Sequence, residues 1–407
     1  MVINEIRPGM TTFIPQQTHQ TPCFRFTVRG PSRCLCFMQI EQTTLLSVLY
    51  KIMSKEITRK DILMLLPLSA LSLADPITDI LALIEFYSEG HKIWFAVGLI
   101  FLIAPCFMFS AMFCATGNST IRCIFNSACL CGFHPFSAAV QRLEAFIRCS
   151  WKKLWHGQTI VEDSYEFEVL KNSKSSAWCE AVFESAPQFV IQLYVMNVQQ
   201  EPVSIIQMIS LPVSFVCLVW AFKAADEDDL KNIPVKYKIL NFLTRSLLLS
   251  TRLFAITYFV VVYKWFIIAV LISHFITLWI MHRLYGTADS DDRSICEKVF
   301  NWYMLFGTSW VGYETFDKDG NETETAMKRL KIITVCSYIF LMLENCVMIS
   351  LYYIPFKYLN PWYSLPLTVC VCLFSFLGAV LRFTIARKFV FDSAVLPLSV
   401  DHSVNYD

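Results

Sequence analysis

Residues 93–115, IWFAVGLIFLIAPCFMFSAMFCA, decide the fold class of this chain. The stretch carries no charged side chain, and about 20 apolar residues are enough for an α-helix to cross the hydrocarbon core of a bilayer. The whole chain has the same character, because 55% of its 407 residues are hydrophobic and only 16% are charged. Soluble domains carry roughly 25% charged residues. The composition therefore predicts a membrane protein rather than two or three soluble domains.

Apolar stretches of this length recur along the chain and predict eight transmembrane helices. They cover residues 62–87, 93–115, 177–198, 203–222, 240–262, 265–285, 332–354 and 363–385. Two shorter apolar segments are expected to form re-entrant or interfacial half-helices: 121–147, which Gly132 and Pro135 interrupt, and 299–311. No segment alternates as a transmembrane β-strand does. The expected fold is therefore all-α and polytopic.

The distribution of lysine and arginine predicts that both chain ends are cytosolic. With the N-terminus inside, the four external loops hold only 3 of the 34 basic residues, namely Lys92, Lys264 and Lys357. An excess of basic residues marks the cytosolic side of membrane proteins. We therefore expect a cytosolic N-terminal tail over residues 1–60, a membrane domain over 61–390 and a short cytosolic tail over 391–407.

Three polar segments inside the membrane domain are expected to be cytosolic linkers. They lie at residues 148–175, 223–238 and 286–296. The second and third contain the acidic runs 226–229 and 289–292. Runs of like charge are usually solvated, so both runs are expected at the protein surface.

Several classes of protein are not expected. The net charge is +1, whereas proteins that bind nucleic acids are usually strongly basic. The chain lacks the glycine-rich, nucleophile-elbow and zinc-protease motifs of common enzymes. Its histidines and cysteines lack the spacing of metal ligands. We therefore expect no enzyme, cofactor, bound metal or nucleic-acid partner.

The most informative residues are carboxylates and amides inside the apolar stretches. Asp75 and Asp79 lie four residues apart, so a helix places them on one face. Glu180 and Glu184 repeat this spacing, and Gln188 and Gln192 extend the same face. An ionisable residue inside a membrane helix costs roughly 2.5–3.5 kcal/mol on insertion scales, and it usually marks a functional site.

Basic residues in later stretches could neutralise these acids. Arg245 and Arg252 are seven residues apart in the fifth stretch, and His274, Glu344, Asn345 and Arg382 occupy the last three. We expect Arg252 to lie opposite the Asp75/Asp79 or the Glu180/Glu184 pair. Two interpretations stay open at this point: an ion-pair network that only holds the helices together, or a polar pathway through them.

Residues 180–194, EAVFESAPQFVIQLY, resemble the signature of the XK-related family. The paired aspartates of the first stretch, with the Tyr-x-x-Gly-His turn at 87–91 that follows them, are also similar to family features. Further resemblances are the Ser-Thr-Arg segment at 250–252 and the Leu-Glu-Asn segment at 343–345. These matches follow the family order over about residues 60–390.

The resemblance implies eight membrane helices with two re-entrant half-helices, and a phospholipid scramblase of the plasma membrane. Some members of the family expose phosphatidylserine during apoptosis after a caspase cuts a terminal tail. The lipid path that the resemblance implies is formed by Asp75, Asp79, Glu180, Glu184, Arg252 and Glu344, and Gln188 shares its face. Implied partners are membrane phospholipids, a caspase, and a single-span accessory protein or a second copy of the chain.

The caspase sites are the weakest part of the resemblance. Residues 1–60 contain no aspartate, so a caspase could cut only elsewhere. Asp401 and Asp229 are the candidate sites, although the bulky Leu230 follows Asp229. Two other functions remain open. The chain could be a solute or ion transporter, or a structural partner of another membrane protein without scrambling activity.

Overall fold

The computed structural model describes residues 57–115, 136–160, 164–199, 202–229, 234–285, 324–359 and 362–387. The chain divides into two units, residues 1–54 and 55–407, and every described residue belongs to the second. The half-helix predicted at 299–311, the linker at 286–296 and the tail at 391–407 lie outside the described residues, as do residues 1–56.

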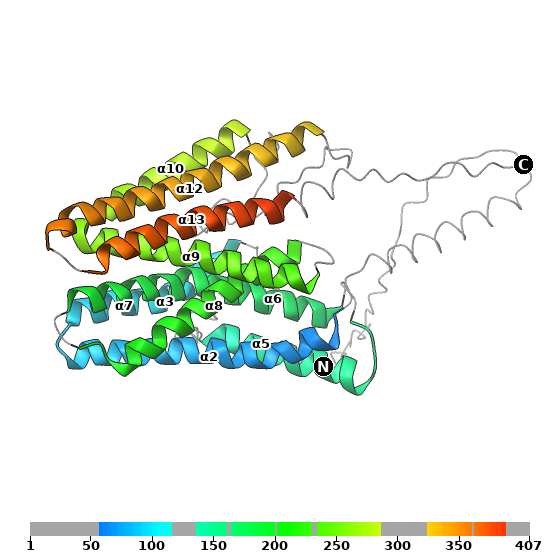
Figure 1. Cartoon of the computed structure of the whole chain (residues 1–407). Helices are drawn as coiled ribbons and strands as arrows, with labels where there is room; N and C mark the ends of the chain where they lie inside the picture. Colours follow the sequence, from blue (N-terminus) through cyan, green and yellow to red (C-terminus); the bar gives the residue numbers. More distant parts are fainter. Residues whose placement is uncertain are drawn as a thin grey trace, which may run out of the picture. The chain divides into compact units, whose positions relative to one another are not determined.

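The described residues are helical apart from short turns, and they contain no β-strand. The elements, shown in Figure 1, are α2 (Arg59–Ser88), α3 (Lys92–Ala115), α5 (Ser137–Cys149), the π-helical turn η2 (Ser150–Trp155), α6 (Tyr165–Glu180), the π-helical turn η3 (Ala181–Ser185), α7 (Ala186–Val198), α8 (Ile205–Asp229), α9 (Val235–Tyr263), α10 (Phe266–Tyr285), α12 (Glu324–Leu359) and α13 (Ser364–Ala386). The prediction of an all-α architecture is confirmed for this part of the chain.

Every predicted apolar stretch lies on one of these helices, and the third lies on α6, η3 and α7 together. Five helices in the described residues are long and apolar enough to cross a membrane. They are Arg59–Ser88, Ile205–Ala224, Val235–Tyr263, Val335–Pro355 and Ser364–Ile385. The described parts of α3 and α10 give the shorter apolar helices Lys92–Ile103 and Phe266–Thr277. A membrane protein with several spans is therefore supported, and the count of eight stays a prediction.

The expected linkers at 148–175 and 223–238 are largely helical. The side chain of Ser164 accepts a hydrogen bond from the Phe167 N–H, and Glu166 and Glu168 lie in the first turn of α6. Serine at the cap and acidic residues in the first turn both stabilise a helix start. Helix α6 therefore begins about twelve residues before the predicted apolar stretch at 177. Helix α8 similarly continues to Asp229.

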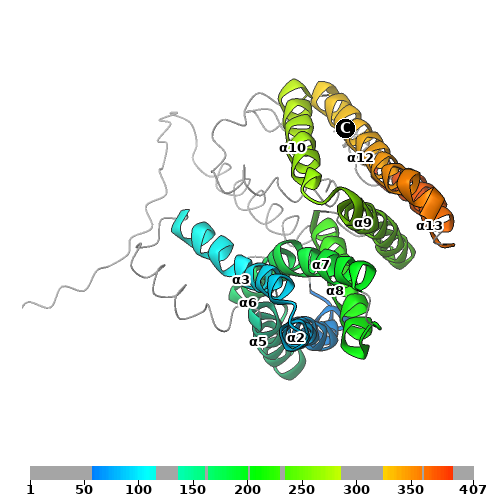
Figure 2. The same ribbon diagram turned by 90° about the vertical axis from the view of Figure 1, so that its left-hand side faces the viewer.

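The helices pack in two connected groups. Helix α2 packs against α3, α5 and α8, and α6 packs against α5 and α8. In the second group α9 packs against α12 and α13, and α10 packs against α9 and α12 (Figure 2). Contacts of α9 with α7 and α8 connect the groups, and the largest apolar core lies there, around Phe189, Phe222, Leu253 and Ile349.

Many large apolar side chains remain exposed on the outer faces of these helices. Ile100 is 64% exposed, Phe266 71% and Phe376 59%. A soluble monomer rarely exposes apolar area on this scale. Lipid chains are the solvent that such faces require.

Candidate functional site

Asp75 of α2 is buried, and hydroxyl groups from two other elements hold its carboxylate. Ser185 of η3 donates to Oδ2 at 2.6 Å, and Ser214 of α8 donates to Oδ1 at 2.5 Å. Asp79, one turn further along α2, has no exposed surface. Its Oδ1 accepts from the Ser210 hydroxyl at 2.8 Å and from Gln192 Nε2 at 2.9 Å.

Glu180, the last residue of α6, binds the first turn of α5. Its Oε1 accepts from the Ala138 N–H at 2.7 Å and from the Ser137 hydroxyl at 2.9 Å. The first N–H groups of a helix lack intrahelical partners and carry partial positive charge, so they stabilise a carboxylate. Arg142 of α5 lines the same small recess as Asp75 and Glu180, and its guanidinium donates to the Leu68 carbonyl at 3.0 Å and to Ser72.

Glu184 lies within η3 and is only 2% exposed. Neither of its carboxylate oxygens has a hydrogen-bond partner among the described residues. Pro187 follows, and proline has no N–H to donate to the preceding turn of a helix. A π-helical turn directly before it accommodates that missing bond, and such turns are frequent at functional sites.

Gln188 of α7 reaches across to α3. Its Nε2 donates to the Gly98 carbonyl at 2.6 Å. A Cβ at position 98 would collide with Cδ2 of Leu83 in α2, so any larger residue there would force the Leu83 side chain to shift. The structure thus brings five predicted residues together in one buried group, which we call the acidic cluster: Asp75, Asp79, Glu180, Glu184 and Gln188.

Among the described residues, Arg252 pairs with Glu344 of α12 and not with the acidic cluster, so that part of the prediction is wrong. Its Nη1 lies 2.8 Å from Oε2 of Glu344 in α12 and donates to Asn345 Oδ1 at 3.1 Å. His274 of α10 places Nδ1 2.7 Å from the same Glu344 oxygen. The reason lies in the packing, because the Arg252 side chain reaches Glu344 of α12 and His274 of α10. Arg252, His274, Glu344 and Asn345 form the arginine–glutamate cluster.

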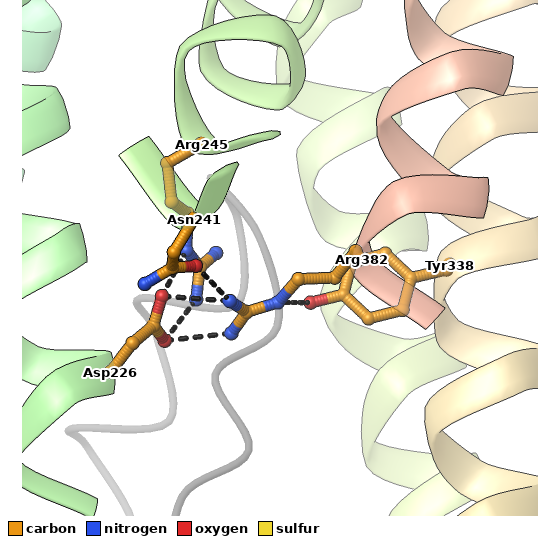
Figure 3. A network of polar contacts seen from close by, with 5 residues as sticks. All are labelled: Asp226, Asn241, Arg245, Tyr338 and Arg382. Carbon is orange, nitrogen blue, oxygen red and sulfur yellow. Dashed lines mark hydrogen bonds and ion pairs between the residues drawn. The ribbon is translucent and has the colours of Figure 1, made fainter. Parts of the chain in front are cut away.

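A third buried network lies at the end of α8 and is shown in Figure 3. Asp226 accepts hydrogen bonds on both oxygens from Arg245 of α9, at 2.7 and 2.5 Å, and from Arg382 of α13, at 2.8 and 2.7 Å. Arg382 also donates to Asn241 Oδ1 at 2.9 Å and to the Tyr338 hydroxyl at 3.0 Å. The side chains of both arginines and the aspartate are fully buried.

This network corrects the interpretation of the acidic run at 226–229. We expected the whole run to be solvated, but Asp226 is buried between two arginines. A signal for it was present in the sequence. Arg245 and Arg382 lie inside apolar stretches, and two buried guanidinium groups need a carboxylate. The hydroxyls of Ser210 and Ser214 could also have been found, since they are four residues apart in an otherwise apolar helix.

The candidate caspase sites remain predictions. Asp401 lies outside the described residues. Asp229 is the last residue of α8, and its side chain is not among those described. Within the described residues, no group of three or more His, Cys, Asp or Glu side chains could hold a metal ion.

Long apolar helices that enclose buried charged clusters are typical of a multi-pass α-helical membrane protein. The family model described as XK-related protein matches residues 63–384, which is most of the chain. The chain therefore belongs to the XK-related family.

Proposed function

We propose that this protein scrambles phospholipids across the plasma membrane, so that lipids such as phosphatidylserine reach the outer leaflet. The observation that carries the proposal is the acidic cluster, in which four carboxylates lie buried among apolar helices. Membership in a family associated with membrane scrambling supports it. Charges in such positions are costly, and they commonly line a pathway for a polar solute.

The proposed topology has eight crossings and both chain ends in the cytosol. Each predicted apolar stretch lies on a helix, and the Lys and Arg distribution supplies the orientation. The half-helices at 121–147 and 299–311 belong to this proposal, although only residues 136–147 of them are described, as α5 and its N-cap Phe136.

Each cluster has a distinct chemical part in the proposed pathway. The lipid head group needs polar partners inside the membrane, while its acyl chains can remain in the lipid. The carboxylates of the acidic cluster can bind an amine, and the Arg252 guanidinium can bind a phosphate. Because Glu344 lies 2.8 Å from Arg252, a phosphate must compete with that carboxylate for the guanidinium.

The proposal includes partners and a trigger. Phospholipids are the substrate, and an accessory single-span protein or a second copy of the chain would be the protein partner. Cleavage by a caspase at Asp401 or Asp229 would link scrambling to apoptosis. The process is downhill and needs no cofactor.

Reconstitution tests this function directly. Purified protein in liposomes with an acyl-chain-labelled phospholipid should let dithionite bleach both leaflets, whereas bleaching of protein-free liposomes stops near half. Glu184→Gln and Arg252→Ala should slow the loss of fluorescence more than they lower the thermal stability. Bleaching that stops near half with wild-type protein, before and after protease treatment, contradicts the proposal. Solute flux without lipid movement would indicate a transporter, and a stable partner complex without activity would indicate a structural role.

A further inference from the structure

The acidic cluster contains acceptor oxygens that no donor satisfies. Among the described residues, five buried side-chain oxygens of this cluster and of the adjacent Gln192 have no hydrogen-bond partner: Asp79 Oδ2, Glu184 Oε1, Glu184 Oε2, Gln188 Oε1 and Gln192 Oε1. An unpaired buried polar atom costs about 1–3 kcal/mol. Native proteins therefore keep few such atoms, and a group of them in one place needs an explanation.

The two glutamines cannot remove this imbalance by rotating their amide groups. Gln188 Nε2 donates to the Gly98 carbonyl, which can only accept. Gln192 Nε2 donates to Asp79 Oδ1 at 2.9 Å and to the Ser210 hydroxyl oxygen at 2.9 Å. Turning either amide would replace these hydrogen bonds by contacts between two acceptors. The oxygens of both amides are therefore held in place as acceptors.

The neighbouring hydroxyl groups cannot help either. Ser185, Ser210 and Ser214 already donate to Asp75 or Asp79. The Ser137 hydroxyl and the Ala138 N–H are bound to Glu180. Glu184 is one turn of helix before Gln188, which is one turn before Gln192, so the three side chains follow one face of η3 and α7. This helix face presents hydrogen-bond acceptors, and two of them are the oxygens of the Glu184 carboxylate.

We propose that the Glu184–Gln188–Gln192 face, together with Asp79, is a binding site for a primary ammonium group, and that it selects lipids whose head group carries one. The inference rests on the proposed function and names its substrate class. A primary ammonium has positive charge and three N–H donors, as the lysine side chain does. It can donate charge-assisted hydrogen bonds to three of the five oxygens at a time, and its charge offsets that of the Glu184 carboxylate.

A quaternary ammonium carries the same charge but has no N–H group. It can neutralise Glu184, but it leaves the amide and carboxylate oxygens without donors. Phosphatidylethanolamine and phosphatidylserine should therefore pass the site faster than phosphatidylcholine. One hydrogen bond to a charged group is worth a factor of about ten, and we expect that difference in the scrambling rate.

A series of lipids with equal charge and decreasing numbers of N–H donors tests the inference. Acyl-chain-labelled phosphatidylethanolamine, its monomethyl and dimethyl derivatives and phosphatidylcholine are compared in liposomes that contain the full-length protein. The expected dithionite bleaching rates fall stepwise along the series, and Glu184→Gln flattens the steps. Equal rates for all four lipids in the wild type would overturn the inference and leave the proposed function standing. Bleaching that stops near half for all four would overturn both.

Glu144→Gln is the matched control. Glu144 is an exposed carboxylate on α5, paired with Arg148 across one helical turn at 2.8 Å. The control should retain the full stepwise dependence. Steps of equal size in wild type, Glu144→Gln and Glu184→Gln would overturn the assignment to Glu184.

A second measurement needs no variant. Wild-type protein in detergent is heated with glycerophosphoethanolamine or with glycerophosphocholine. A ligand that binds the folded state raises the melting temperature. We expect the ethanolamine compound to give the larger shift, and equal shifts would count against the site.

Discussion

At the scale of single residues, the buried charges differ in how completely they are paired. Asp226 has four hydrogen bonds from two arginines. Asp75 has two hydroxyl donors, whereas Glu184 has no partner in the described part of the chain. A fully paired charge holds helices in one arrangement, and an unpaired one is available to a ligand. This contrast agrees with a structural role for Asp226 and with the binding role that we propose for Glu184.

Substitution of Asp226 should destabilise the protein strongly. Asp226→Asn removes the carboxylate charge that both Arg245 and Arg382 contact in the described residues, and breaking a buried ion pair by neutralising one partner costs about 3–5 kcal/mol. Thermal unfolding in detergent measures the loss. Glu144→Gln, which breaks an exposed pair, should cost at most about 1 kcal/mol. Equal losses for the two variants would contradict the structural role of Asp226.

The thiol of Cys149 should react slowly. Cys149 ends α5, outside the apolar membrane helices, and burial raises its pKa to about 11. At neutral pH the thiol is therefore protonated, and only the thiolate attacks an alkylating reagent. We expect maleimide to label Cys149 far more slowly in the folded protein than after denaturation, as peptide mass spectrometry can follow. Equally fast labelling in both states would show that the thiol is accessible and ionised.

At the scale of elements, helices α2 and α3 approach each other closely at Gly98. A Cβ there would collide with Cδ2 of Leu83 and lie 3.3 Å from Gln188 Oε1. The same glycine carbonyl accepts the hydrogen bond of Gln188. The helix contact and the position of the Gln188 amide therefore depend on one missing side chain.

Gly98→Ala should destabilise the protein by about 1–3 kcal/mol, the usual cost of overpacking. Leu83→Ala removes the colliding atoms at the price of a cavity. The double variant should lose clearly less stability than the sum of the losses of the two single variants, because the new methyl group partly fills that cavity. Additive losses in thermal unfolding would show that Gly98 and Leu83 are not in contact.

The positions of the helices were predictable from the sequence, whereas their partners were not. A bilayer requires long apolar stretches, so each of the eight stretches lies on a helix. Helical spacing correctly grouped Asp75 with Asp79, but spacing identifies a face and not the helix that covers it. Arg252 was therefore assigned to the wrong carboxylates. Asp226 was missed because the three acidic residues after it suggested a solvated surface.

At the scale of the whole molecule, the three polar networks follow the two groups of helices. The acidic cluster lies among α2, α5, α6, η3, α7 and α8, and the arginine–glutamate cluster lies among α9, α10 and α12. Asp226 binds α8 to both α9 and α13. In the described residues, its ion pairs join the two groups of helices. Movement of one group against the other therefore either breaks these ion pairs or leaves their geometry unchanged.

The proposed topology makes a prediction about which turns face outward. Trp265 and Trp362 lie in the turns before α10 and α13 and are 82% and 85% exposed, and His156 lies in the exposed turn after η2. With both chain ends in the cytosol, Trp265→Cys and Trp362→Cys should react with a membrane-impermeant maleimide in intact cells. His156→Cys should react only after permeabilisation. Wild-type protein measures the labelling of the native cysteines, which is subtracted. Labelling of His156→Cys in intact cells would contradict the odd number of crossings that the topology places between His156 and Trp265. Labelling of Trp265→Cys and Trp362→Cys on opposite sides would contradict the even number between those two turns. Either result would require a different path of the chain through the membrane.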